Sequence, residues 1–189
     1  LYSETNCPIT VLSGDNVTLT AKKGSNNYIY DKREELTDEN EYSAAIYSLC
    51  DLDVQGKGEL VIISKANNGI HSKNDLEVKN LTLSVTCMDN ALKGNDSVTI
   101  ECGSMTLIAK QGDGIKTTDS DISSKGNQRG TVSLRGGNID IYAATDGIDA
   151  SYDVNVSDGT ILNIYTGEYS PYSETVKSKG SQYYIRSNS

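Results

Sequence analysis

Apolar side chains recur along the chain in short alternating runs, and the runs repeat at a nearly constant interval. A large aliphatic residue marks each unit, and successive markers are 24, 22, 23 and 33 residues apart. The markers are Ile46, Ile70, Leu92, Ile115 and Ile148. Two further apolar clusters with a period of two follow each marker, which is typical of strands that bury one face. The pattern therefore predicts three short strands in each unit.

Residues that favour tight turns separate the second and third strands of each unit. They lie at 55–58, 79–80, 102–103, 136–138 and 158–159. A period near 23 residues without helical segments indicates a solenoid, and the Leu/Asn pattern of leucine-rich repeats, which share this period, is absent. We therefore expect an all-β fold, a single-stranded right-handed parallel β-helix with coils of about 23 residues.

The chain is predicted to form one domain, residues 1–189, whose regular coils occupy 44–165. The highly charged segment 31–43 is interpreted as a solvated loop excursion. The longest interval between markers holds about ten extra residues, which places an insertion at 119–130. The tail, 166–189, is expected to cap the solenoid, and residues 175–178 would also suit the start of a further coil. Because the chain opens inside a repeat, we expect a mature or trimmed protein.

Composition narrows the choice of partner. The sequence has no Trp and no Phe but 12 Tyr, and its formal net charge is −9. An acidic chain argues against a nucleic-acid partner and suits cation binding. No apolar run approaches the ~20 residues of a membrane span. We expect a monomer.

The four cysteines, Cys7, Cys50, Cys87 and Cys102, include no Cys-x-x-Cys pair, so zinc or thioredoxin-like chemistry has little support. We expect buried free thiols that behave as small hydrophobic side chains. If a disulfide forms, Cys7 with Cys50 is the first choice, because the two fall at similar phases of the repeat.

The repeats resemble those of bacterial extracellular carbohydrate-binding β-helix proteins, which are related in fold to pectate lyases. The likeness lies in residues 45–48 (AIYS), 52–60 (LDVQGKGEL), 68–76 (NGIHSKNDL) and the two Asp-Gly-Ile units at 113–115 and 146–148, and it covers about residues 15–165. One departure is Asn90-Ala91-Leu92, where Asp or Asn followed by Gly-Ile is expected. The resemblance implies a secreted or cell-surface protein that binds cellulose or acidic sugars and holds calcium in the solenoid.

The acidic copies of the repeat are the candidate metal site. Asp113 and Asp146 occupy one phase in adjacent coils, so their carboxylates are predicted to stack about 4.8 Å apart, a separation that suits oxygen ligands of Ca²⁺. Asp149 is the third predicted ligand. The alternative is that these residues serve turns through side-chain hydrogen bonds, which we prefer for a second acidic phase. That second phase comprises Asp51, Asp75, Asp96, Asp119 and Asp153.

A sugar-binding surface is the second candidate, and with no Trp its aromatic platforms must be Tyr. Tyr142 and Tyr152 are the predicted aromatic contacts, while Tyr165, Tyr169 and Tyr172 suit cap packing equally well. Basic residues in and near the insertion could meet uronate carboxylates, or could be scattered solubilising charge. They are Lys116, Lys125 and Arg129, with Arg135 nearby.

Catalysis has weaker support. β-Elimination on a uronate needs a base, for which Lys93, Lys116 and Arg135 are available, but nothing in the sequence singles one out. The one histidine, His71, is interpreted as a surface or turn residue. We therefore predict a non-catalytic, calcium-binding, extracellular protein that recognises cellulose or polygalacturonate. The alternatives are a calcium-dependent pectate lyase and a structural cell-surface solenoid.

Overall fold

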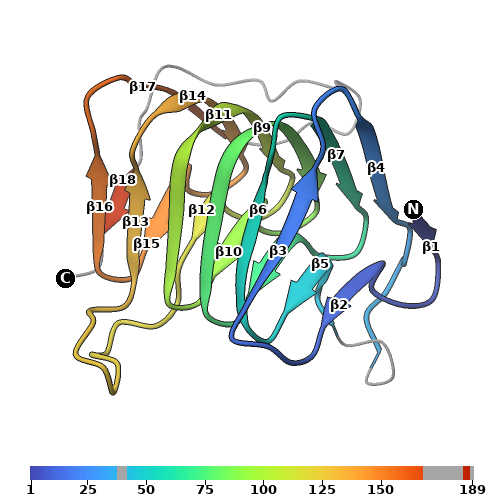
Figure 1. Ribbon diagram of the computed structural model, residues 1–189, viewed down its shortest axis with the longest axis horizontal. Coiled ribbons are helices and arrows are strands. Elements are labelled where there is room, and N and C mark those ends of the chain that lie inside the picture. Colours follow the sequence, from blue (N-terminus) through green and yellow to red (C-terminus); the bar gives the residue numbers. More distant parts are fainter. Residues whose placement is uncertain (38–41, 168–184, 188–189) are drawn as a thin grey trace.

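The computed structural model describes residues 1–37, 42–167 and 185–187, and these form two sheets of parallel strands without a helix (Figure 1). The 7-stranded sheet contains β2 (Ile9–Val11), β5 (Ala44–Ser48), β8 (Asn68–Ser72), β10 (Leu92–Gly94), β12 (Ile115–Lys116), β15 (Ile148–Ala150) and β18 (Ile185–Ser187). The 11-stranded sheet contains β1 (Tyr2–Ser3), β3 (Asn16–Ala21), β4 (Asn26–Asp31), β6 (Asp51–Gly56), β7 (Glu59–Ser64), β9 (Asp75–Cys87), β11 (Ser97–Ala109), β13 (Thr131–Leu134), β14 (Gly137–Ala143), β16 (Asp153–Val156) and β17 (Thr160–Thr166). The predicted all-β class is confirmed.

The strand register follows the repeat read from the sequence. Ile46 lies opposite Ile70, Ile70 opposite Leu92, Leu92 opposite Ile115, and Ile115 opposite Ile148. Each marker is fully buried. Burial of one such side chain stabilises the fold by about 1.5–3 kcal/mol, so this ladder ties neighbouring repeats together.

Two positions extend the ladder beyond the predicted markers. Ile9 pairs with Ile46, and Ile185 pairs with Ile148. The interval from Ile9 to Ile46 contains the charged segment and is longer than a regular repeat. The sequence therefore did not show that Ile9 occupies the marker position. Residues 168–184 and 188–189, with most of the predicted cap and the segment 175–178, lie outside the described residues.

The predicted turn positions have unusual backbone angles, but at 79–80 and 102–103 the predicted second and third strands are one continuous strand, β9 or β11. Left-handed φ angles occur there at Gly56, Asn80, Gly103, Gly137 and Gly159. Asn80, with φ 65°, is the one residue other than glycine with positive φ among those described, and asparagine tolerates this conformation best. The repeat therefore turns the same corner each time.

One core residue was predicted on the wrong side of its strand. The apolar alternation of the last unit predicts Ile161 and Ile164 as core residues, but Ile161 is 59% exposed. Strand β17 pairs with β14 so that Leu162 lies opposite Ile139 and Ile164 opposite Ile141. Because side chains alternate along a strand, Leu162 and Ile164 face the interior and Ile161 faces outward.

The charged segment 31–43 is not wholly solvated, and the prediction was wrong for two of its residues. Asp31 ends β4 and is 0% exposed, and the Arg33 side chain folds back onto it. Arg33 Nε donates to Asp31 Oδ1 at 2.8 Å, and Arg33 Nη2 to Asp31 Oδ2 at 2.6 Å. A charged pair at this depth acts as part of the core.

All four cysteines are free, so the prediction of free thiols is confirmed and Cys7 is not bonded to Cys50. Cys7, Cys50 and Cys87 are buried, while Cys102 is partly exposed. Burial raises the pKa of the Cys87 thiol far above its usual value. The buried cysteines are therefore unreactive packing residues. Across the described residues, no helix is both long and apolar enough to cross a membrane.

Candidate functional site

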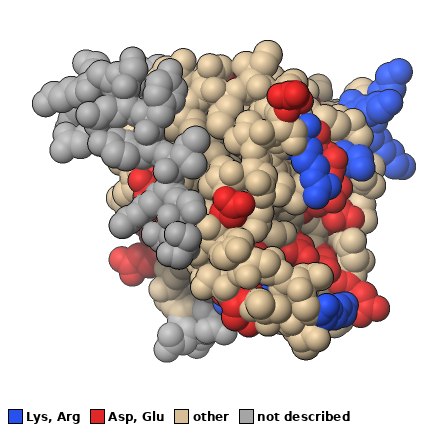
Figure 2. Space-filling model, turned by 90° about the vertical axis from the view of Figure 1, so that its left-hand side faces the viewer, with Lys and Arg blue, Asp and Glu red and all other residues tan. Residues whose placement is uncertain are grey.

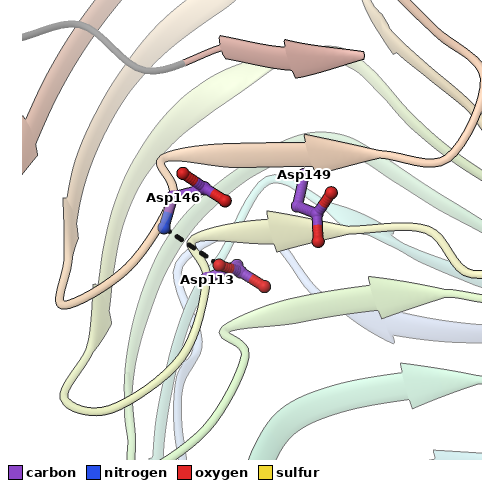
Figure 3. Close-up of side chains that lie close together, drawn as sticks. All are labelled: Asp113, Asp146 and Asp149. Carbon is purple, nitrogen blue, oxygen red and sulfur yellow. Dashed lines mark hydrogen bonds between the residues drawn. The ribbon is translucent and has the colours of Figure 1, made fainter. Parts of the chain in front are cut away.

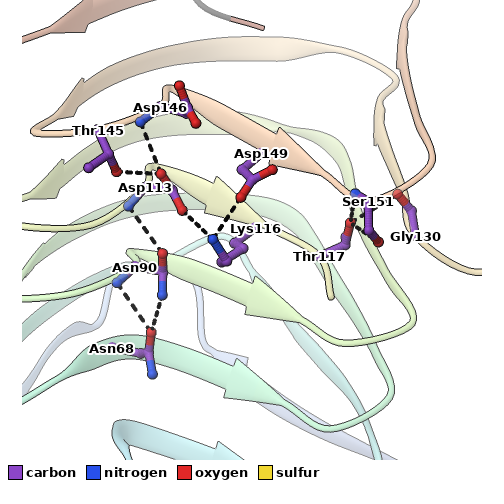
Figure 4. A network of polar contacts seen from close by, with 10 residues as sticks. All are labelled: Asn68, Asn90, Asp113, Lys116, Thr117, Gly130, Thr145, Asp146, Asp149 and Ser151. Carbon is purple, nitrogen blue, oxygen red and sulfur yellow. Dashed lines mark hydrogen bonds and ion pairs between the residues drawn. The ribbon is translucent and has the colours of Figure 1, made fainter. Parts of the chain in front are cut away.

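A ladder of Asn and Asp side chains runs along the N-terminal ends of the strands in the 7-stranded sheet (Figure 4). Asn68 Oδ1 accepts from the backbone N–H of Asn90 at 3.2 Å, and Asn90 Oδ1 accepts from the N–H of Asp113 at 3.1 Å. Asp113 Oδ1 accepts from the N–H of Asp146 at 2.9 Å and from the Thr145 hydroxyl. Each side chain thus accepts a hydrogen bond from the backbone of the equivalent residue in the next repeat. One of the two carboxylate oxygens of Asp113, Oδ1, is therefore used to hold neighbouring repeats together.

Three carboxylates gather at the acidic end of this ladder (Figure 3). Asp113 lies just before β12, Asp146 just before β15, and Asp149 within β15. One oxygen from each lies within 4.8 Å of the other two. Asp113 is 4% exposed, whereas Asp146 and Asp149 are partly exposed. The structure therefore brings together the three residues that the sequence proposed as metal ligands.

Lys116 lies between two of these carboxylates. Its Nζ atom is 2.7 Å from Asp113 Oδ2 and 2.7 Å from Asp149 Oδ2. Burial alone would lower the pKa of Lys116, but hydrogen bonds and attraction to Asp113 and Asp149 outweigh it, so its pKa is raised. The sequence predicted Lys116 as a contact for a uronate ligand. In the structure its ammonium group pairs with two of the three carboxylates and offsets part of their negative charge.

The cluster has the donor chemistry for a hard cation. Carboxylate oxygens are preferred ligands of Ca²⁺, and ligand oxygens around one ion lie within about 5 Å of one another. The Lys116 ammonium already occupies the space between Asp113 and Asp149, which shows that a positive charge fits there. The residues therefore fit calcium, provided that Lys116 turns away when the ion binds.

A second row of side chains crosses the 7-stranded sheet beside this cluster, one residue after the aliphatic ladder on each strand, and its first two members are buried. Register places Tyr47, His71, Lys93, Lys116 and Asp149 opposite one another on successive strands. The Tyr47 and His71 rings pack edge to face, 5.1 Å between centroids. Burial lowers the pKa of Lys93, which the nearby Asp89 partly offsets. The row thus changes from aromatic to basic to acidic across the sheet.

His71 is buried rather than a surface residue, so that interpretation was wrong. It is 4% exposed, and its Nε2 lies 3.0 Å from Asn95 Oδ1. Burial lowers the pKa of His71 to about 4, even though the Asn95 hydrogen bond acts in the opposite direction. Lys93 and Lys73 lower the pKa further. The imidazole is therefore neutral in the folded protein at neutral pH.

We expect His71 to make the protein less stable in acid. The unfolded histidine has a pKa near 6.5, so the unfolded state binds the proton first and stability falls as the pH drops from about 6.5 to about 4. Urea unfolding of the wild type and His71→Gln at several pH values checks this. The difference in unfolding free energy between the two should change across that window, and a constant difference would contradict the assignment.

The basic residues predicted in the insertion do not form a free positive surface. Arg129 Nε lies 2.8 Å from Asp96 Oδ2, and Arg129 Nη1 is 3.1 Å from Asp121 Oδ2. Arg135 pairs with Glu101 at 2.5 Å, and Lys125 is exposed. Figure 2 shows basic and acidic side chains next to one another along the right-hand side of this face. Arg129 therefore anchors the insertion to the coil.

The predicted tyrosines separate in the structure. The Tyr142 ring stacks on Tyr165, with 4.9 Å between centroids and 10° between planes. Tyr152 lies between β15 and β16, where its N–H donates to Gly130 at 3.0 Å. Tyr142 is thus part of an aromatic pair in the 11-stranded sheet, whereas Tyr152 lies in the connection between β15 and β16.

Sequence reasoning missed Asn68, Asn90 and Thr145 as partners of the site. The signal for the two asparagines was present, because they occupy the phase of Asp113 in earlier repeats. Thr145 could not be found in this way, because it lies in the connection just before β15 and not at the repeated position, and its hydroxyl donates to Asp113 from there.

Comparisons with known proteins agree with this architecture. A family model described as carbohydrate-binding domain-containing protein matches residues 1–189. Among solved structures, the polysaccharide lyase-like protein from C. thermocellum, as a gadolinium derivative, is similar with a TM-score of 0.73 and 31% sequence identity, over 89% of this chain and 74% of that chain. No curated protein sequence matches. The chain belongs to the family of carbohydrate-binding domain-containing proteins.

Proposed function

We propose that the two sheets are the faces of a right-handed parallel β-helix. Each regular repeat contributes one strand to the 7-stranded sheet and then two strand segments to the 11-stranded sheet, and every pairing between named strands is parallel. Connections between parallel strands of one sheet are right-handed in nearly all proteins, which supports the handedness.

We propose further that the protein is a secreted or cell-surface module, monomeric and bacterial, that binds polysaccharide with the help of calcium. The observation that carries this proposal is the gathering of Asp113, Asp146 and Asp149 beside the basic residues Lys93 and Lys116. The similar solved structure is a gadolinium derivative, and gadolinium, like calcium, is a hard cation that takes oxygen ligands.

The ligand of this site is proposed to be an acidic polysaccharide of the polygalacturonate class. Calcium held by Asp113, Asp146 and Asp149 would supply a positive charge for a uronate carboxylate. Turning Lys116 away from Asp113 and Asp149 would place a second ammonium group beside Lys93, because the two lysines lie opposite each other in the sheet. Ammonium groups bind carboxylates through charge-assisted hydrogen bonds.

A calcium-dependent lyase is the second candidate function. Lys93 favours it, because burial lowers the pKa of this lysine and a neutral amine is the form that removes a proton. In β-elimination the base takes the proton at C5 of the uronate, and the electron pair expels the glycosidic oxygen at C4. We propose the binding function first, because it needs only the clustered carboxylates and the two lysines, whereas the lyase also needs Lys93 in its neutral form.

Binding to polygalacturonate in calcium buffer tests this proposal. We expect the wild type to bind, chelator to abolish binding, and Lys93→Ala to weaken it about tenfold through loss of one charge-assisted contact. Lys57→Ala is the matched control, because Lys57 is an exposed lysine in the turn between β6 and β7.

The outcomes separate the three candidate functions. Binding without any unsaturated product supports the non-catalytic module, whereas growing ultraviolet absorbance that is lost in Lys93→Ala supports the lyase. Failure to bind any polysaccharide in a broad panel would leave the structural solenoid as the remaining function.

A further inference from the structure

The second row of the 7-stranded sheet, which contains Lys93 and Lys116, is accessible over only part of its length. Its members on β5 and β8, Tyr47 and His71, are 8% and 4% exposed. On β10, β12 and β15 the row is partly exposed, and the side chains of Lys116 and Asp149 are 27% and 20% exposed. A ligand that lies along the row therefore meets its basic and acidic part but not its aromatic part.

Three aromatic rings in mutual contact close the row at β5 and β8. The centroids of Tyr42 and Tyr47 are 5.2 Å apart, and those of Tyr47 and His71 are 5.1 Å apart. Tyr47 also forms a small hydrophobic cluster with the buried residues Cys7 and Ala44, against which Tyr42 packs. We call Tyr42, Tyr47 and His71 the aromatic wall. Because its inner two members are buried, it blocks the row and is not a platform for a ligand.

The buried ion pair of Asp31 and Arg33 holds the aromatic wall in place. Arg33 Nη2 donates to the backbone carbonyls of Tyr42 and Ala44, both at 2.9 Å. The same guanidinium group donates twice to the Asp31 carboxylate, which fixes its orientation. Arg33 itself is 1% exposed. The backbone at Tyr42 is therefore tied to the interior, and the wall is a fixed part of the fold.

On the other side of the accessible part, the sheet soon ends. From β10 the order of strands continues through β12 and β15 to β18, which is the last strand of this sheet in the described part of the chain. The three strand steps from β10 to β18 span roughly 14 Å at the usual spacing of strands. One hexose of an extended polysaccharide is about as long as one strand step, so this part of the sheet has room for about three sugar residues.

We propose that the site binds about three residues at one end of an acidic polysaccharide. The terminal residue would lie beside Lys93 against the aromatic wall, and the chain would lead away over Lys116 and Asp149. This rests on the proposed function and narrows its ligand from a polymer to a chain end. The interior of a polymer needs space on both sides of the bound residues, and the wall removes that space on one side.

Calorimetric titration with oligogalacturonates of increasing length, in calcium buffer, tests the proposal. The affinity should rise about tenfold or more from the monomer to the trimer, because each added carboxylate gains a charge-assisted contact, and should then stay constant within about twofold up to the hexamer. A groove open at both ends would instead continue to gain affinity beyond the trimer.

Chain ends can also be counted on the polymer. Polygalacturonate and a sample of the same polymer shortened by partial hydrolysis are immobilised at equal mass. The amount of protein bound at saturation should rise in proportion to the number of chain ends, whereas a protein that binds the interior of the chain would bind the two samples equally.

Variants of the aromatic wall locate the cause. Tyr42→Ala combined with Tyr47→Ala removes two rings and should reopen the row, so that the hexamer binds more tightly than the trimer. Tyr42→Phe combined with Tyr47→Phe keeps both rings and should keep the wild-type dependence on length. Tyr28→Ala is the matched control, because Tyr28 is a 60% exposed tyrosine on β4 of the other sheet. Melting curves show whether each variant is folded.

The outcomes separate this proposal from the proposed function. Affinity that continues to rise from the trimer to the hexamer, or saturation that does not depend on the number of ends, would overturn chain-end binding and leave the proposed function standing. A folded double alanine variant with the wild-type dependence on length would overturn the role of the wall. A wild type that binds neither the oligogalacturonates nor the polymer would overturn both proposals.

Discussion

Calcium is expected to raise the midpoint of thermal unfolding of this protein, and chelator to lower it again. A ligand that binds only the folded state at 100 times its Kd adds about 2.7 kcal/mol to the free energy of unfolding. For a chain of this size that corresponds to a shift of roughly 5–11 °C. The reason is that Asp113, Asp146 and Asp149 meet within 4.8 Å only when the strands β12 and β15 are paired, so the unfolded chain has no equivalent site.

Three variants locate the effect. Asp149→Asn removes one ligand charge and should remove most of the calcium shift. Asp153→Asn is the matched control, because Asp153 is an exposed residue at the start of β16, and asparagine can still accept from the Val154 N–H. Lys116→Met removes the cation that competes for the site, so it should lower stability without calcium and enlarge the shift with calcium. Equal shifts in the wild type and Asp149→Asn would place the ion elsewhere.

The acidic cluster could be predicted from sequence because parallel stacking places equal phases of a repeat side by side. Asp113 and Asp146 share one phase, so their proximity follows from the interval between markers once the insertion is removed. The role of Lys116 did not follow in this way. Its partner Asp149 lies 33 residues later in the chain, and only the register shows that the two side chains are opposite.

The arrangement of the tyrosines shows a second limit of the sequence pattern. Tyr2 and Tyr30 lie opposite each other in the first repeats, where the interval to the next marker is irregular. The prediction grouped Tyr142 with Tyr152, because the two are close along the chain. The sheet instead groups Tyr142 with Tyr165, because they lie opposite each other on β14 and β17.

The prediction for the charged segment 31–43 was wrong for a different reason. A run rich in Asp, Glu, Lys and Arg is usually solvated, and composition alone cannot reveal that two of its members neutralise each other in the interior. Arg33 also satisfies backbone carbonyls, because its Nη2 donates to Tyr42 and Ala44, both at 2.9 Å. These contacts tie the segment to the start of β5, where the regular repeat begins.

Removing one member of this pair is expected to be strongly destabilising. Arg33→Met would leave the Asp31 carboxylate fully buried without its partner, and the loss of one member of a buried ion pair costs about 3–5 kcal/mol. Lys32→Met is the matched control one residue away. The Lys32–Glu4 pair is 2.8 Å long, but its side chains are 39% and 54% exposed, and such pairs contribute at most about 1 kcal/mol. Urea unfolding of the three proteins measures the difference.

The double variant decides whether charge is the cause. With Asp31→Leu and Arg33→Met together, no buried charge is left unpaired, although the carbonyls of Tyr42 and Ala44 still lose a donor. The double variant should therefore be more stable than Arg33→Met alone, because replacing both partners of a buried pair with apolar groups is often close to neutral. If the double variant is instead less stable by the sum of the two single changes, the Arg33 side chain acts through its carbonyl contacts and packing, and its pairing with Asp31 contributes little.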